Sequence, residues 1–143
     1  MFYRIQICIL LLFVLIHGLK CYIRCQNPVP YSRNIWLSVT CSRNAVGLLR
    51  RLCSSLRSRS TTEWKKGEHV LSGCFKIPIW TAIATFLRDD GLFRGHAAIF
   101  ESCANDGIWV YDQTPSSRMM RRKLKRIQLS SPHYNADNFY TIK

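Results

Sequence analysis

The stretch "GHAAIFESCANDGIWVYDQ", residues 95–113, decides how this sequence folds. Two apolar runs flank the sequence Asn105-Asp106-Gly107, which is a typical turn signal, so the stretch predicts an antiparallel hairpin. His96 opens its first strand and Asp112 closes its second. A histidine and an aspartate held on neighbouring strands can orient and activate a nucleophile. The hairpin therefore predicts one half of a catalytic site.

The register of this hairpin decides whether His96 and Asp112 meet. A three-residue turn at positions 105–107 places both side chains on one face but about four residues out of register, which is roughly 13 Å along a strand. A bulge or a longer loop within residues 101–104 is then required to bring them together. The alternative is that His96 is a strand-end histidine whose ring hydrogen-bonds to the backbone.

The rest of the chain predicts one helix and three more strands. Ser42 is the expected N-cap, and the apolar residues that follow it recur at the spacing of a helix with one buried face. This stripe consists of Ala45, Leu49, Leu52, Cys53 and Leu56. Strands are expected at residues 79–87, 122–129 and 138–142, and the polar segment 58–69 is expected to be a loop. One helix followed by about five antiparallel strands predicts an α+β fold.

The N-terminal segment is typical of a secretory signal peptide. Arg4 precedes an apolar run from Ile7 to Ile16, which is too short to cross a bilayer comfortably. Cleavage after Gly18 divides the chain into a signal peptide, residues 1–18, and one domain, residues 19–143. Cleavage after Cys21 and an uncleaved anchor are the alternatives. The protein is therefore expected to be secreted and extracellular.

The cysteine pattern agrees with an oxidising compartment. Removal of the signal peptide leaves six cysteines: Cys21, Cys25, Cys41, Cys53, Cys74 and Cys103. An even number in a secreted chain predicts up to three disulfides, although the spacing does not reveal which cysteines pair. No pair has Cys-x-x-Cys spacing and histidines are few, so neither a metal nor another cofactor is expected.

The chain is strongly basic. Lys and Arg number 21 against 8 Asp and Glu, which gives a formal net charge of +13. For a secreted protein this charge favours anionic partners such as bacterial envelopes, glycans or membranes. The densest basic run is "RMMRRKLKR", residues 118–126, which is either a solvated face or a binding patch. It contains no aromatic residue that could stack on bases, so nucleic acid is not an expected partner.

Six segments, taken in their order along the chain, resemble a known family. They are "NAVGLLRRLC", "TTEWKKGEHV", "IPIWTAIATF", "GHAAIF", "GIWVYDQ" and "NADNFYTI", and they cover most of the chain after Cys41. In this order they resemble the second family of type VI secretion amidase effectors, and especially the domesticated amidase effectors of animals. The resemblance implies a papain-like core of the NlpC/P60 and CHAP kind, with an N-terminal helix packed on the sheet. It also implies cleavage of amide bonds in peptidoglycan peptides.

The resemblance implies roles for individual residues. The family has a cysteine in the first turn of the helix, where backbone N–H groups and the helix dipole favour the reactive thiolate. His96 matches the family histidine, and Asp112 matches the third residue that orients it. Ala45 stands at the position of the nucleophile. Cys41, four residues upstream, is the substitute nucleophile if the helix begins one turn earlier.

Two further departures accompany Ala45. Trp80 stands where the family usually has glycine before a strand, and Thr114 replaces the tryptophan that commonly follows Asp-Gln. All three departures are expected near the cleft. The expected function is therefore a secreted, monomeric, antibacterial peptidoglycan amidase homologue of innate immunity that is catalytically impaired, a pseudoenzyme. The alternative is a cationic secreted protein that binds anionic bacterial surfaces without catalysis.

Overall fold

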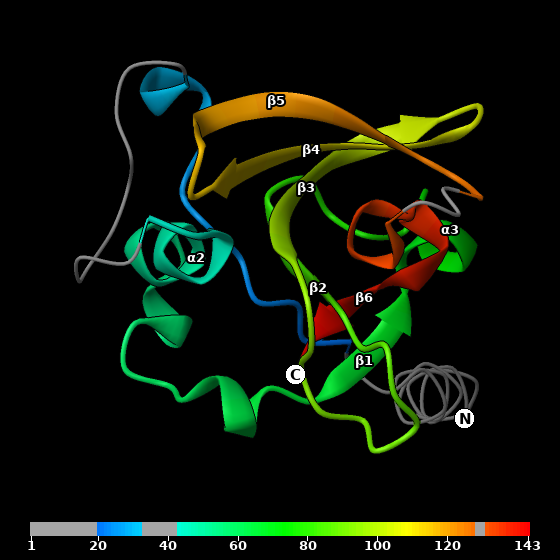
Figure 1. The fold of residues 1–143 in the computed structure, drawn as a ribbon, viewed down its shortest axis with the longest axis horizontal. Coiled ribbons are helices and arrows are strands. Elements are labelled where there is room, and N and C mark those ends of the chain that lie inside the picture. The colour runs from blue at the N-terminus through cyan, green and yellow to red at the C-terminus, as the bar shows by residue number, and fades with distance from the viewer. Residues whose placement is uncertain (1–19, 33–42, 128–130) are drawn as a thin grey trace, which may run out of the picture.

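A six-stranded antiparallel sheet forms the centre of the molecule in the computed structural model, which describes residues 20–32, 43–127 and 131–143 (Figure 1). The strand order is β1-β6-β2-β3-β4-β5. The strands are β1 (Lys66–His69), β2 (Thr81–Thr85), β3 (Ala97–Ala104), β4 (Gly107–Thr114), β5 (Ser117–Lys125) and β6 (Phe139–Ile142). The short helices of the described residues are α2 (Ala45–Leu52), α3 (Val70–Gly73) and the 3₁₀ turns η1 (Val29–Tyr31), η2 (Ser54–Leu56), η3 (Thr61–Glu63), η4 (Pro132–Tyr134) and η5 (Ala136–Asn138).

The five strands that the sequence predicts are present, and β1 is a sixth. It lies in segment 58–69, which was predicted to be a loop, so that prediction is wrong for its last residues. In the part of the chain that the structure describes, β1 is a polar edge strand paired with β6, with Lys66 opposite Ile142 and His69 opposite Tyr140. Its residues show no alternation of apolar and polar side chains, so the local sequence carries no strand signal.

Helix α2 begins at Ala45, and its N-cap is Asn44 instead of the predicted Ser42. The Asn44 side chain accepts a hydrogen bond from the Gly47 N–H at 3.0 Å, which satisfies one of the free donors of the first turn. Ser42 itself lies outside the described residues. The predicted apolar stripe is buried throughout, although α2 ends at Leu52 and the chain continues as η2.

Two apolar layers cover the two faces of the sheet. Helix α2 packs on β3 and β4, where Leu48 and Leu49 join a cluster with Ile99. On the opposite face α3 and η5 cover a second cluster that contains Phe100 and Val110 (Figure 1). Neighbouring strand residues such as Ile99 and Phe100 serve opposite layers because side chains alternate along a strand. Each such buried side chain contributes roughly 1.5–3 kcal/mol.

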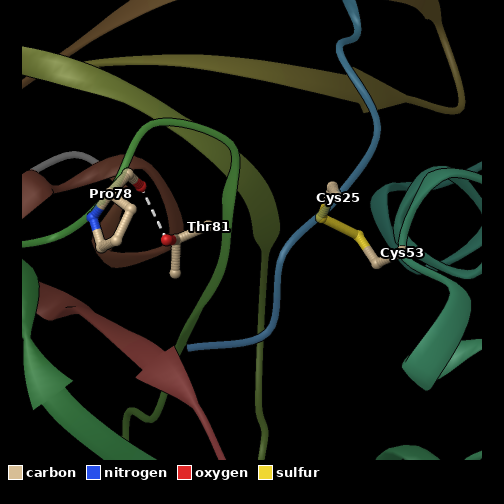
Figure 2. Close-up of a disulfide and its surroundings, with 4 residues drawn as sticks. All are labelled: Cys25, Cys53, Pro78 and Thr81. Carbon is tan, nitrogen blue, oxygen red and sulfur yellow. Dashed lines mark hydrogen bonds between the residues drawn. A yellow bond between two sulfur atoms is a disulfide. The ribbon is translucent and has the colours of Figure 1, made fainter. Parts of the chain in front are cut away.

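Two disulfides join distant segments. Cys25–Cys53 ties the N-terminal arm to the end of α2, as Figure 2 shows, and Cys74–Cys103 ties the segment after α3 to β3. Close to the first, the Thr81 hydroxyl donates to the Pro78 carbonyl at 2.7 Å (Figure 2). Two of the up to three predicted disulfides are therefore present among the described residues, and Cys21 is a free, exposed thiol. Cys41 lies outside the described residues.

We expect mass spectrometry of the non-reduced protein to find this disulfide pattern. Peptides linked through Cys25–Cys53 and Cys74–Cys103 should be present before reduction and absent after it. Cys21 should react with an alkylating reagent without reduction, because its thiol is free and exposed. Alkylation of Cys53 or Cys103 in the native protein would contradict the pattern, since both belong to disulfides.

The predicted signal peptide, residues 1–18, lies outside the described residues. Among the helices that the structure describes, none is long and apolar enough to cross a membrane.

Candidate functional site

The turn between β3 and β4 is tighter than the sequence suggested. Ala104 lies opposite Gly107, so the turn consists of Asn105 and Asp106 alone. Further along the hairpin the register shifts, because Phe100 lies opposite Val110 while Ser102 lies opposite Trp109. Glu101 is therefore the extra residue of a β-bulge. The prediction of a bulge within residues 101–104 is confirmed, and the three-residue turn is corrected.

This bulge places His96 and Asp112 on the same face of the sheet. Without it, the pairing of Ala104 with Gly107 would continue to Ile99 opposite Asp112, and His96, three residues away, would point to the other face. With it, Ile99 lies opposite Tyr111, so Ala98 lies opposite Asp112 and His96 is only two residues further along. Two residues correspond to about 7 Å along a strand, which the two side chains span.

The His96 imidazole and the Asp112 carboxylate form a buried pair. A hydrogen bond of 2.9 Å joins His96 Nε2 and Asp112 Oδ2. The His96 side chain is 9% exposed and the Asp112 side chain is 0% exposed. The backbone N–H of His96 donates to the Thr85 hydroxyl at 2.9 Å, which holds the start of β3. The alternative, a His96 ring bonded to backbone, is therefore not the arrangement in this structure. Use of Nε2 leaves Nδ1 as the nitrogen that can take a proton from a nucleophile.

A cavity of about 290 Å³ lies beside this pair. One wall is the start of α2, and the other walls come from the ends of β3 and β4 and from η4. Its lining residues are Asn44, Ala45, Val46, Gly95, His96, Gln113, Thr114, Pro115, His133 and Tyr134. Gln113 Nε2 donates to the Asn44 carbonyl at 3.3 Å, which ties β4 to the helix start. The fold therefore brings Ala45, His96 and Thr114 to one cavity, with Asp112 buried next to His96.

No thiol lines this cavity among the residues that the structure describes. Four cysteines are consumed in the two disulfides, and the free Cys21 lines a different cavity together with Lys20 and Glu68. Ala45, at the first position of α2, contributes only a methyl group. Cys41, the substitute nucleophile of the sequence prediction, lies outside the described residues.

Trp80 lies away from the cavity, contrary to expectation. Its side chain packs edge-on against Tyr111, with ring centroids 5.7 Å apart, and it is not among the cavity-lining residues. Its backbone has φ = 65°, the left-handed conformation that glycine adopts without strain. The N–H of Trp80 donates to the Phe100 carbonyl at 2.7 Å and its carbonyl accepts from Cys25 at 2.8 Å. The position therefore favours glycine for its backbone, and the strain costs about 1–2 kcal/mol.

Three residues of the site were missed by the sequence prediction. Arg122 Nε donates to Asp112 Oδ1 at 3.0 Å, and the Tyr134 ring packs against the His96 ring with centroids 4.8 Å apart. His133 lies against Gly95, whose φ is +109° and where any Cβ would collide with the His133 ring. Arg122 was counted only as one charge of run 118–126. Strand alternation within that run could have separated its inward from its outward arginines.

Comparison with known proteins gives three matches. The family model described as domesticated amidase effector 2 matches residues 13–142. A protein of Ixodes scapularis named domesticated amidase effector 2 is 46% identical over 121 residues, which is 85% of this chain and 84% of the relative. A solved structure of type 6 secretion amidase effector 2 has a TM-score of 0.66 and covers 82% of this chain and 91% of its own. At 23% identity this last match shows a common α+β fold.

Proposed function

Because the chain belongs to the domesticated amidase effector 2 family, we propose that its cavity beside His96 is built for peptidoglycan peptides and that its ancestral reaction is amide hydrolysis. The observation that supports this most directly is the buried His96–Asp112 pair, which faces the same cavity as the start of α2. Its orientation fits a papain-like arrangement of nucleophile, base and orienting residue.

The proposed ancestral reaction is cysteine-dependent amide hydrolysis, which this geometry supports. A cysteine at position 45 would give its proton to His96 Nδ1 while its sulfur attacked the amide carbonyl carbon. The C–N bond would then break, the amine would leave with the proton from His96, and a thioester would remain for water to hydrolyse. In this reaction Asp112 would accept from His96 Nε2 and so leave Nδ1 available to the nucleophile. The first N–H groups of α2 favour both the thiolate and the developing oxyanion.

This chain has no thiol at position 45 for the first step of that reaction. The Ala45 methyl group can neither attack a carbonyl nor carry a proton, so the protein is catalytically impaired and retains base and orienting residue only. Thr114, another departure from the family pattern, also lines the cavity. The remaining function is binding of peptidoglycan peptides. Cys41 stays the alternative nucleophile.

We further propose that the protein is secreted and acts outside the cell. Residues 1–18 are the signal peptide and residues 19–143 form one papain-like domain that acts as a secreted monomer in defence against bacteria. The two disulfides support this location, because such bonds persist in oxidising compartments.

The alternative function is charge-driven binding to anionic bacterial surfaces, which the net charge of +13 favours. The basic run 118–126 supports it weakly, because four of its members have acidic partners. These ion pairs are Arg121–Glu101, Arg122–Asp112, Lys123–Asp106 and Arg126–Asp137. Much of the charge in this run is therefore neutralised locally, which is typical of a solvated face.

The purified protein is expected to co-sediment with insoluble peptidoglycan and to release no amino groups from it. Binding should persist in 1 M salt, where the screening length falls to about 3 Å, because a shaped cavity does not depend on long-range charge. Sedimentation and an amine assay at low and high salt measure both properties. Cys41→Ala is the control and should change neither of them.

Other outcomes of this experiment separate the candidate functions. Complete loss of binding in 1 M salt would favour the charge-driven alternative. Vigorous amine release that Cys41→Ala abolishes would identify Cys41 as the nucleophile and overturn the assignment of position 45.

A further inference from the structure

The Asp112 carboxylate is held from two sides, and only one of them is His96. Asp112 Oδ2 meets His96 Nε2 at 2.9 Å, and Oδ1 accepts from Arg122 Nε at 3.0 Å. The Asp112 side chain is 0% exposed, so both carboxylate oxygens depend on protein partners in the folded chain. We propose that Arg122 is the positioning residue of this pair: it fixes the Asp112 carboxylate and, through it, the tautomer and orientation of His96.

The Arg122 guanidinium is itself held in place. Arg122 lies opposite Val110 and Met120 lies opposite Asp112, so Arg122 and Asp112 are diagonal neighbours on the same face of β4 and β5. Nη2 of Arg122 is 3.4 Å from the Ser117 hydroxyl and 3.7 Å from the Met120 sulfur. These contacts direct Nε toward the carboxylate. The planar guanidinium donates from fixed directions, which a lysine cannot reproduce.

Tyr134 contacts both ends of this arrangement, His96 and Arg122. Its ring packs on the His96 imidazole at a centroid distance of 4.8 Å, and the Arg122 Cζ atom lies 5.9 Å from the same ring. An aromatic face attracts a guanidinium at this distance. Arg122, Asp112, His96 and Tyr134 therefore form a closed ring of contacts. The imidazole is held by the contact of Nε2 with Asp112 and by the tilted packing of the Tyr134 ring.

The neighbouring Arg121 has the opposite environment and serves as a matched control. It lies across from Tyr111 in the β4–β5 pairing, whereas Arg122 lies across from Val110, so the two arginines point to opposite faces. Arg121 pairs with Glu101 at 2.7 Å and stacks on Trp109 at 3.7 Å. Removal of either arginine takes away one positive charge and one ion pair. Only Arg122 contacts the His96–Asp112 pair.

The test is the tautomer of His96, read from its ring nitrogens by ¹⁵N NMR in the full protein. In the native protein Nε2 should carry the proton, because the carboxylate accepts from it. Arg122→Met should shift the tautomer ratio about tenfold toward the other form, roughly the effect of losing one hydrogen bond. Arg121→Met should leave the ratio unchanged. Arg122→Lys should give an intermediate ratio, and it replaces the methionine variant if that variant does not fold.

An unchanged His96 spectrum in a folded Arg122→Met or Arg122→Lys variant would overturn the proposal. Equal changes in the Arg121 and Arg122 variants would also overturn it, since they would indicate an effect of net charge alone. The readout needs no nucleophile, so it is independent of the proposed function. If the tautomer responds to Arg122 while the protein has no affinity for peptidoglycan, the proposed function fails and the positioning role stands.

Discussion

Substitution of Ala45 by cysteine is expected to create a reactive thiol and to restore thiol-dependent hydrolysis of peptidoglycan. The new side chain would lie at the first position of α2, in the cavity that also contains His96. Backbone N–H groups and the dipole at the helix start favour the thiolate, and His96 Nδ1 can accept the proton. Iodoacetamide should therefore label this position faster at neutral pH than it labels an ordinary thiol. Sacculi should release amino groups in the presence of this variant.

The dependence on His96 is the measurement that decides this prediction. His96→Ala, added to Ala45→Cys, should reduce hydrolysis by about 100-fold or more, the usual contribution of a general base. A Cys21→Ser background removes the exposed thiol that would otherwise react with the reagent. Val46→Cys is the matched control, because it places a thiol one residue further along the same cavity wall. Its labelling should not depend on His96.

A buried, inert thiol at position 45 would show that the helix start is not a nucleophile site. Labelling that is rapid but indifferent to His96→Ala would lead to the same conclusion. The buried pair would then serve the stability of the hairpin only. Weak hydrolysis with strong His96 dependence would agree with the prediction, because the dependence on His96, and not the rate, identifies the site.

Loss of the Cys25–Cys53 disulfide is expected to destabilise the fold strongly. The bond spans a sequence separation of 28, and closing a loop of this length stabilises a fold by about 3–4 kcal/mol through the unfolded chain. The double variant Cys25→Ala/Cys53→Ala should lower the free energy of unfolding by this amount in urea titrations. This change is a large fraction of the stability of a typical domain.

The second disulfide is the control for this experiment. Cys74–Cys103 has a separation of 29, so Cys74→Ala/Cys103→Ala should cost nearly the same free energy. Only the first double variant should alter the NMR signals of His96, because Cys53 is the C-cap of α2 and the other end of that helix borders the cavity. A loss below about 1 kcal/mol in both double variants would contradict the prediction. Equal disturbance of His96 in both would show that the bond does not hold α2 specifically.

The local sequence predicted most elements because their signals lie within a few residues. The stripe of Leu49, Leu52 and Leu56 marks the helix at its own spacing, and the apolar runs mark the strands of the hairpin. The failures have identifiable physical causes. β1 is polar and exists through its pairing with β6 across the sheet, and Asn44 replaces Ser42 as N-cap because the helix begins two residues later than the pattern suggested.

By itself the sequence determined which residue types are present: His96, Asp112, an alanine at position 45, and the order of segments that resembles the family. Only the tertiary structure decided which of them meet. The extra residue Glu101 shifts the pairing register of β3 against β4 by one residue. Because side chains alternate between the two faces of a strand, this shift moves the side chains beyond the bulge to the other face. Arg122 lies on β5, only 10 residues after Asp112, whereas Tyr134 comes from η4. No local periodicity records the pairing register that brings them to Asp112 and His96. The sequence therefore determines which chemical groups the site contains, whereas the register of the sheet determines their geometry.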